Sequence, residues 1–153
     1  MIPRVQQLDI RERLRWRADA DEFEEIRSLW IAHSKAEDAR DLDGLVATLT
    51  PDCVYELSWL DVRWEGHEGA RRFYTELLGA FPDIDFDLQD IVVGPQGVYE
   101  YARVTATWSE PWIGKEPDGE RHEWHNAIFF PWDPEQRRFA GEKVFGSPAS
   151  PGA

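Results

Sequence analysis

Apolar side chains recur at three- and four-residue spacing in three segments, and this period predicts helices with one buried face. The first helix is expected over residues 21–39, where the shared face carries Phe23, Ile26, Leu29, Trp30 and His33. A shorter helix is expected over 42–49, with Asp41 as its N-terminal cap. The third is expected over 67–81, just ahead of Pro82.

Alternating or β-branched segments predict strands in the rest of the chain. The first strand is expected over 53–59, with a short hairpin partner at 62–64, and longer strands are expected over 86–93, 98–108, 120–132 and 138–145. Three helices cannot cover both faces of such a sheet. The predicted fold class is therefore α+β, with the helices on one concave face of a curved antiparallel sheet and a pocket in the gap between them.

The length of 153 residues suits one domain with a sizeable core. Residues 1–20 are rich in arginine and predict an N-terminal arm or an extra helix. Residues 148–153 contain only Pro, Ala, Ser and Gly and predict a flexible tail. The domain itself is expected over residues 21–147.

Composition narrows the classes of partner. A net charge of −13 argues against nucleic acid and anionic membranes. Aromatic residues make up 13% of the chain, with eight Trp, and such side chains either fill a core or line a cavity for an apolar ligand. Cys53 is the single cysteine, and the N-terminus has no long apolar run, so a cytoplasmic protein is expected.

The segment 121–132, RHEWHNAIFFPW, begins polar and ends apolar, as the floor of a half-closed pocket requires. Strand alternation places His122, Trp124, Asn126 and Ile128 on one face and Glu123, His125 and Ala127 on the other. The sequence therefore allows two alternative pockets. One joins Trp124 and Asn126 to His33, and the other joins His125 to Tyr55.

Other polar residues have competing interpretations. His33 lies on the buried stripe of the first helix, either as a core histidine or as a pocket donor or base. Glu142 is either a pocket residue or, as the favoured interpretation, part of a sheet-face ion pair with a nearby arginine. No metal site is expected, because the His122-x-x-His125 spacing suits a helix better than a strand.

Three strings carry a resemblance to a known family. They are DLDGLVATLTPDCVYEL at 41–57, EGHEGARRFYTELLGAFPDI at 65–84 and HNAIFFPWDPEQRRFAGEKVF at 125–145. In this order they resemble the nuclear transport factor 2-like superfamily, and within it the SnoaL-like branch of polyketide cyclases and ester cyclases. The resemblance implies a cone-shaped α+β barrel with a deep apolar pocket and a homodimer packed through the sheet. Because the superfamily includes members without known activity, the fold does not decide the reaction.

When the functional residues of related enzymes are carried over one by one, some positions of this chain match them and others do not. His33 falls where ketosteroid isomerases place an oxyanion-binding tyrosine, whereas Leu57 occupies the position of their general base and Ile128 that of their second donor. Tyr55 matches the water-holding tyrosine of limonene-epoxide hydrolases, although Arg103-Val104-Thr105 lacks the carboxylate of their Arg-x-Asp.

Other branches of the superfamily supply further matches. The pair His125-Asn126 is similar to the pocket residues of scytalone dehydratases, and Asp38 could supply the acid that dehydratase-like members carry on the first helix. Related cyclases often place an aspartate where this chain has Phe145-Gly146-Ser147.

The predicted catalytic residues are His33, Tyr55, His125 and Asn126, and the predicted binding residues are Trp30, Leu57, Trp59, Phe73, Leu77, Arg103, Trp108, Trp124 and Ile128. We expect a cofactor-independent acid/base enzyme of the cyclase, isomerase or dehydratase type, acting on a hydrophobic oxygenated small molecule. A histidine would move the proton, and Tyr55 and Asn126 would hold the oxygen. The alternatives are a non-catalytic protein that binds a hydrophobic ligand and a dimeric interaction module.

Overall fold

The computed structural model describes residues 1–146, so Ser147 and the tail expected over 148–153 lie outside the described residues. The elements in chain order are α1 (Arg4–Gln7), α2 (Ile10–Arg13), α3 (Ala20–Asp38), α4 (Leu42–Ala47), β1 (Leu49–Leu57), β2 (Val62–Glu65), α5 (Gly66–Ala80), β3 (Asp85–Gly94), β4 (Gly97–Thr107), β5 (Arg121–Asp133) and β6 (Arg138–Phe145).

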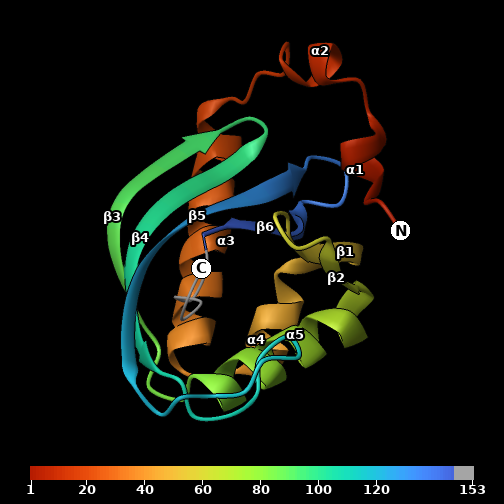
Figure 1. Ribbon diagram of the computed structural model, residues 1–153. Coiled ribbons are helices and arrows are strands. Elements are labelled where there is room, and N and C mark those ends of the chain that lie inside the picture. The colour runs from red at the N-terminus through yellow and green to blue at the C-terminus, as the bar shows by residue number, and fades with distance from the viewer. Residues whose placement is uncertain (147–153) are drawn as a thin grey trace.

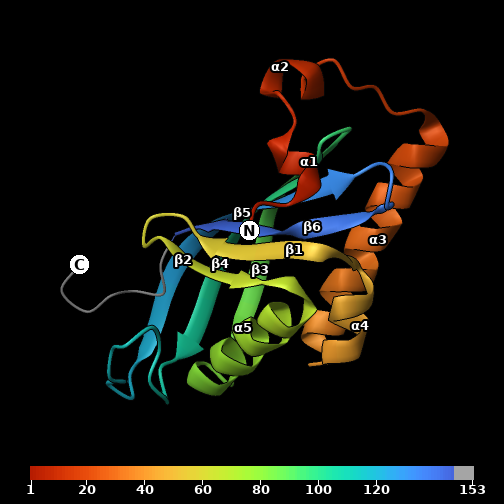
Figure 2. The same ribbon diagram turned by 90° about the vertical axis from the view of Figure 1, so that its right-hand side faces the viewer.

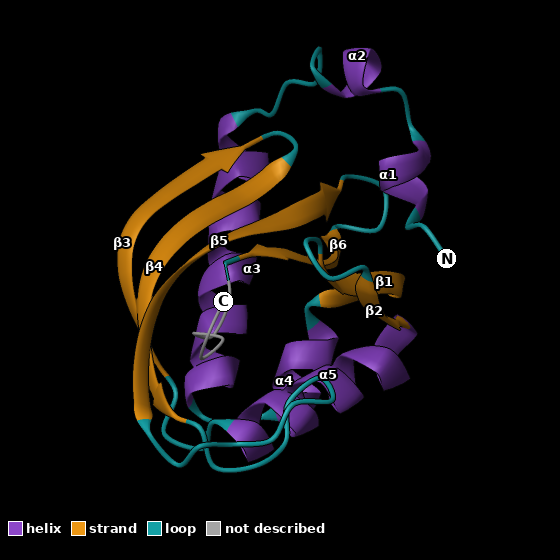
Figure 3. Ribbon diagram, viewed as in Figure 1, coloured by secondary structure: helices purple, strands orange, loops and turns teal. Residues whose placement is uncertain are grey.

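One six-stranded sheet, in the order β2-β1-β6-β5-β4-β3, forms the body of the protein. Its strands bend around α3, while α4 and α5 close one end (Figures 1 and 3). The view in Figure 2 shows α5 packed along β1 and β2. This arrangement confirms the predicted α+β fold with helices on the concave face. The parallel pairing of β1 with β6 was not predicted, since the sequence indicated antiparallel strands only.

Helix α3 spans nearly the predicted range because its N-terminal end carries a capping residue and acidic side chains. The Asp19 side chain accepts a hydrogen bond from the backbone N–H of Glu22, and Asp21 and Glu22 lie in the first turn. The helix buries Ile26, His33 and Ala36. Phe23, which was assigned to the same face, is 37% exposed, because it lies in the first turn of the helix.

Strand β1 differs most from its predicted bounds. It begins at Leu49, which was assigned to the preceding helix, and it ends at Leu57. The register of its pairing with β6 shifts between Leu49 and Val54. Gly141 of β6 lies at this irregularity with a φ of +106°, and a Cβ atom there would be 2.0 Å from the carbonyl oxygen of Val54. Only glycine allows the two backbones to approach so closely.

The N-terminal arm packs against the sheet through few residues. Val5 is buried, and Arg4 pairs with the buried carboxylate of Asp133 in β5. Within residues 1–146, no helix is both long and apolar enough to cross a membrane.

We expect Gly141→Ala to lower the free energy of unfolding by at least about 2 kcal/mol, since it combines an unfavourable φ with a backbone clash. Gly79→Ala in α5 is the matched control, because a Cβ atom there meets nothing within 4 Å. That control should be neutral or slightly stabilising. Urea denaturation of both variants checks the prediction, and an unchanged midpoint for Gly141→Ala would contradict it.

Candidate functional site

Four buried side chains from four elements meet inside the concave face. They are His33 of α3, Tyr55 of β1, Tyr74 of α5 and Glu142 of β6, and together we call them the Tyr74 cluster. Helical periodicity turns His33 and Tyr74 inward, as does strand alternation for Tyr55. Glu142 stands beside Tyr55 in the register of β1 and β6, immediately after Gly141.

The position of one proton on His33 follows from its neighbours. The Thr48 hydroxyl donates to the carbonyl oxygen of Leu45 at 2.7 Å, so it must accept from His33 Nδ1, which also lies 2.7 Å away. Nδ1 therefore carries a proton. When the imidazole is neutral, Nε2 is an acceptor, and it lies 3.0 Å from the Tyr74 hydroxyl.

The Tyr74 hydroxyl is the centre of the cluster. It lies 3.0 Å from His33 Nε2, 3.1 Å from the Tyr55 hydroxyl and 2.7 Å from Glu142 Oε2. Because this hydroxyl has one proton and accepts at most two hydrogen bonds, one of the three contacts must accept from it and the other two must donate to it.

Two proton arrangements satisfy every contact while keeping both tyrosines neutral and the cluster without net charge. In the first, protonated Glu142 and Tyr55 donate to Tyr74, which donates to neutral His33. In the second, the imidazolium of His33 and Tyr55 donate to Tyr74, which donates to the Glu142 carboxylate. The two arrangements differ only by a shift of two protons along His33, Tyr74 and Glu142, so the geometry of these residues suits a proton relay.

Electrostatics favours the uncharged arrangement. Burial lowers the pKa of His33 to about 3. Burial, reinforced by the nearby charge of Glu37, raises the pKa of Glu142 well above its ordinary value. Both shifts have the sign that desolvation of a charged group produces.

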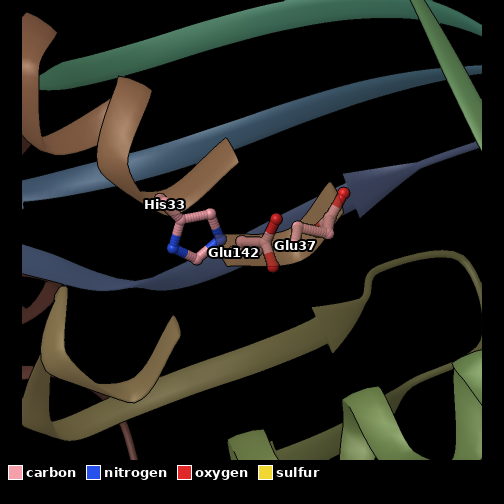
Figure 4. Close-up of side chains that lie close together, drawn as sticks. All are labelled: His33, Glu37 and Glu142. Atoms are coloured by element: carbon pink, nitrogen blue, oxygen red, sulfur yellow. The ribbon is translucent and has the colours of Figure 1, made fainter. Parts of the chain in front are cut away.

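Two further carboxyl groups face the same interior. Glu37 lies one helical turn after His33, and burial raises its pKa to about 7. Glu100 of β4 has its pKa raised to about 8 by burial and by the charge of Glu37. Figure 4 shows Glu37 gathered with His33 and Glu142 between α3 and the sheet. The site thus holds three acids that titrate far above the usual carboxylate range.

Two small cavities adjoin these acids. The first, of about 30 Å³, is lined by Glu37, Leu57, Phe73, Leu77, Ile84, Phe86, Trp112, Trp124, Asn126, Ile128, Glu142, Val144 and Gly146. The second, of about 70 Å³, is lined by Trp30, His33, Ser34, Glu37, Asp38, Phe86, Leu88, Glu100, Ala102 and Phe130. Glu37 borders both cavities. The relay links them, because Glu142 borders the first and His33 borders the second.

Of the predicted catalytic residues, three lie at this site. His33 and Tyr55 belong to the Tyr74 cluster, and Asn126 lines the first cavity. His125 does not, since it lies exposed on the opposite face of β5 and stacks on Tyr101 with ring centroids 5.4 Å apart. Neither of the two pockets left open by the sequence forms as one cavity: Trp124 and Asn126 line the first cavity and His33 lines the second, while His125 lies on the opposite face of β5.

The predicted binding residues divide in the same way. Leu57, Phe73, Leu77, Trp124 and Ile128 line the first cavity, and Trp30 lines the second. Trp59, Arg103 and Trp108 line neither and need correction. Trp59 is 41% exposed in the turn after β1, Arg103 pairs with Asp87 at 3.1 Å on the outer face, and Trp108 is buried against Phe81.

Two acids also differ from expectation. The predicted ion pair of Glu142 with an arginine was wrong, because Glu142 is buried and bonds Tyr74. Asp38 borders the second cavity but is exposed, and the helical acid nearest the cluster is Glu37.

Sequence reasoning missed Tyr74, Glu37 and Glu100 as functional residues. Tyr74 lies in the helix predicted over 67–81 but was not singled out. Glu37 follows His33 by four residues, a spacing that places both on one helical face. Glu100 alternates with Val98 and Ala102, which are buried, so an acid at this point was a usable signal.

The ligand atoms of His33, Glu37 and Glu142 lie within 4.8 Å of one another, so their residue types could hold a cation. Both nitrogens of His33 already have hydrogen-bond partners, however. A cation on Nε2 would have to displace the Tyr74 hydroxyl. The hydrogen bonding of the cluster therefore suits protons better than a metal.

Comparisons with known proteins agree with this fold. The family model described as the SnoaL-like domain matches residues 30–136. A candidate SnoaL-like polyketide cyclase from Jannaschia sp. is similar with a TM-score of 0.73 and 18% identity, over 86% of this chain and 92% of that one. AclR, a candidate hydroxylase from Streptomyces galilaeus, has a TM-score of 0.65 and 22% identity, over 82% and 90%.

A candidate ketosteroid isomerase from Kribbella flavida has a TM-score of 0.61 and 16% identity, over 83% of this chain and 81% of that one. At these identities the likeness concerns the fold alone, and no curated protein matches the chain. The family match covers well over half of the sequence. The chain belongs to the SnoaL-like domain family.

Proposed function

We propose that this protein is a cofactor-independent acid/base enzyme that moves a proton on a neutral, hydrophobic, oxygenated small molecule. The observation that carries the proposal is the relay of His33, Tyr74 and Glu142, which ends at both cavities beside Glu37. Cyclisation, isomerisation and dehydration through an enol all require a base and an acid at one site.

Glu37 is the residue that we assign as the base. Its pKa of about 7 means that a large share of the protein carries the carboxylate at neutral pH, while the carboxylate is more basic than an exposed one. It borders both cavities, so it can reach a C–H bond next to a carbonyl group in either. The abstracted proton passes to Glu37, and the electron pair moves onto the carbonyl oxygen.

Glu142 is the matching acid, since its raised pKa keeps it protonated. When it gives its proton to the developing oxyanion, the Tyr74 hydroxyl can turn from His33 Nε2 to the new carboxylate, 2.7 Å from Oε2. His33 and Tyr55 act through Tyr74, as positioning residues. Asn126 borders the same cavity and can bond a substrate oxygen.

The substrate is neutral in this proposal. Among the described residues that line the two cavities there is no Lys or Arg, whereas four carboxyl groups, those of Glu37, Asp38, Glu100 and Glu142, border them. An anion would meet like charge without a counter-ion. A non-catalytic binding protein is the weaker alternative, because a cavity that serves only to bind an apolar molecule gains nothing from titratable groups near neutrality.

A second role rests on the outer face of the sheet, which we propose as a homodimer interface. Tyr99, Tyr101 and Phe145 are each more than two-fifths exposed there, and Tyr99 stacks on Phe129 with centroids 4.4 Å apart. Exposed aromatic side chains gathered on one face favour association. We keep the cytoplasm as the proposed location, since the lone buried thiol of Cys53 fits a reducing compartment.

We expect the protein to exchange the α-protons of tetralone, a two-ring ketone, with deuterium from water. Glu37→Gln and Glu142→Gln should each lower the enzymatic rate by about 100-fold or more, because each removes one proton-transfer group. Proton NMR of the ketone measures the rate. Glu123→Gln, exposed on the outer face of β5, is the control. Equal rates for Glu37→Gln, Glu142→Gln and the wild-type protein would refute the assignment.

The raised acids also predict how stability depends on pH. A carboxyl group whose pKa is higher when folded than when unfolded contributes stability fully below its ordinary value of 4.5, and this contribution is lost as the pH rises through the folded pKa. Stability should therefore fall between about pH 4.5 and 8. Glu100→Gln should remove part of this fall and stabilise the protein at pH 9 by about 1–3 kcal/mol. Denaturation across pH checks this, and a fall of unchanged size in the variant would count against a buried Glu100.

The dimer is tested separately from catalysis. Tyr101→Glu places a charge on the outer face and should shift the protein from dimer to monomer in analytical ultracentrifugation. Leu60→Glu, which changes an equally exposed apolar residue in the turn after β1, should leave the dimer intact. A monomeric wild-type protein at micromolar concentration would rule out the interface.

A further inference from the structure

Three polar groups in the wall of the first cavity are left unpaired by the packing of the described residues. They are the indole N–H groups of Trp112 and Trp124 and the side-chain oxygen of Asn126. Each belongs to a residue that is more than nine-tenths buried, and none has a hydrogen-bond partner within residues 1–146. Buried polar atoms are seldom left unpaired in a folded protein, so this group needs an explanation.

The other buried tryptophans show that unpaired indoles are not a general feature of this core. Trp64 donates to Glu76 at 3.3 Å, Trp108 to the carbonyl oxygen of Glu110 at 2.8 Å, and Trp132 to Glu22 at 3.1 Å. None of these three borders either cavity. Three buried indole N–H groups have no partner in the described part of the chain: that of Trp30 borders the second cavity, and those of Trp112 and Trp124 face the first.

The two free indoles lie at the same end of that cavity. Both pack against Phe81, with ring centroids 6.1 Å away for Trp112 and 5.7 Å away for Trp124. The acids lie at the other end. Ile128 of β5 lies opposite Val144 of β6 in this antiparallel pair. Trp124 lies on one side of the pair, toward the start of β5, and Glu142 lies on the other side, toward the start of β6.

The space between the two ends is apolar. Leu57, Phe73, Leu77, Ile128 and Val144 line it, and Asn126 follows Trp124 on the same face of β5. A ligand that fits this lining has a flat apolar body, its reacting carbonyl at the acids and a second oxygen at the indoles.

We propose that Trp112 and Trp124 form a binding subsite for a second, non-reacting oxygen of the substrate. This inference rests on the proposed function, because it describes the far end of the same cavity. Two N–H donors select an ether or carbonyl oxygen, which accepts hydrogen bonds. A free carboxylate is disfavoured, because the acids lie in the same cavity and no described lining residue carries positive charge.

The loop that carries Trp112 gives the wall of the first cavity a way to move when a ligand binds. At about 30 Å³ the cavity holds no more than a few water molecules, so a two-ring ligand requires the wall to move. Trp112 is carried by the loop between β4 and β5, and the next residue, Ile113, has a φ of +51°. This conformation is unfavourable for a β-branched residue, so the loop is held partly by the stacking of Trp112 on Trp64. In the proposal, the ligand takes the place of part of that packing.

The test compares two tetralones that differ in one atom. One carries a methoxy group on the ring carbon para to the ketone, and the other carries an ethyl group there, so an oxygen is replaced by a methylene of similar shape. The wild-type protein should bind the methoxy compound roughly threefold to tenfold more tightly, as one or two hydrogen bonds would give. Isothermal titration calorimetry measures both affinities.

Trp112→Phe and Trp124→Phe remove the donors but keep an aromatic ring, and each should reduce this preference toward one. Trp59→Phe, at an exposed tryptophan away from the cavity, should keep it. Thermal denaturation of each variant shows that it is folded. Equal binding of the two tetralones by the wild-type protein, or an undiminished preference in both cavity variants, would overturn the subsite.

Glu142→Gln separates this inference from the proposed function. It should lose α-proton exchange but retain the preference for the methoxy compound, because the acid lies at the other end of the cavity. A preference without exchange in the wild-type protein would support the subsite and refute the enzyme. Exchange without a preference for the methoxy compound would support the enzyme and refute the subsite.

Discussion

The burial of Glu142 against Tyr74 is the constraint on which the site depends. A carboxyl group in this interior is stable only if it is protonated or if its charge is compensated. The Tyr74 hydroxyl allows both, because it can accept from the acid or donate to the carboxylate at 2.7 Å. His33, held by Thr48, provides the partner at the other side of the hydroxyl. Gly141 lets β1 approach β6 closely enough for this cluster to close.

In the proposed function, the same constraint supplies reactivity. Three acids share one interior, so ionising any one of them raises the cost of ionising the next, and their pKa values spread upward from the usual carboxylate range. The spread leaves one acid near neutrality and another protonated, which is the difference that general acid–base chemistry uses. The fold itself is common to proteins with different names, so the chemistry lies in this cluster rather than in the architecture.

The position of the acids also explains the mixed match to related enzymes. Leu57 occupies the strand position where a ketosteroid isomerase would carry its base, and this chain instead brings carboxyl groups from α3, β4 and β6. One concave face can receive an acid from any element that borders it. A missing carboxylate at one position therefore does not mean that the cavity lacks acids. The residue-by-residue comparison with related enzymes did not detect the acids of this chain.

The sequence by itself determined the elements and the α+β class, because these depend on local periodicity, capping and turn residues, and three strings that resemble a known family indicated the family. It also selected His33, Tyr55 and Asn126 as candidates, and their side chains are buried on the inner face of regular elements. It could not rank His125 against Asn126, since strand alternation gives two faces without saying which one meets the helices. Only the tertiary structure decided that Tyr74 joins His33 to Glu142 and that two indoles face a cavity unpaired, because these contacts link residues distant in the chain whose proximity depends on the curvature and register of the sheet.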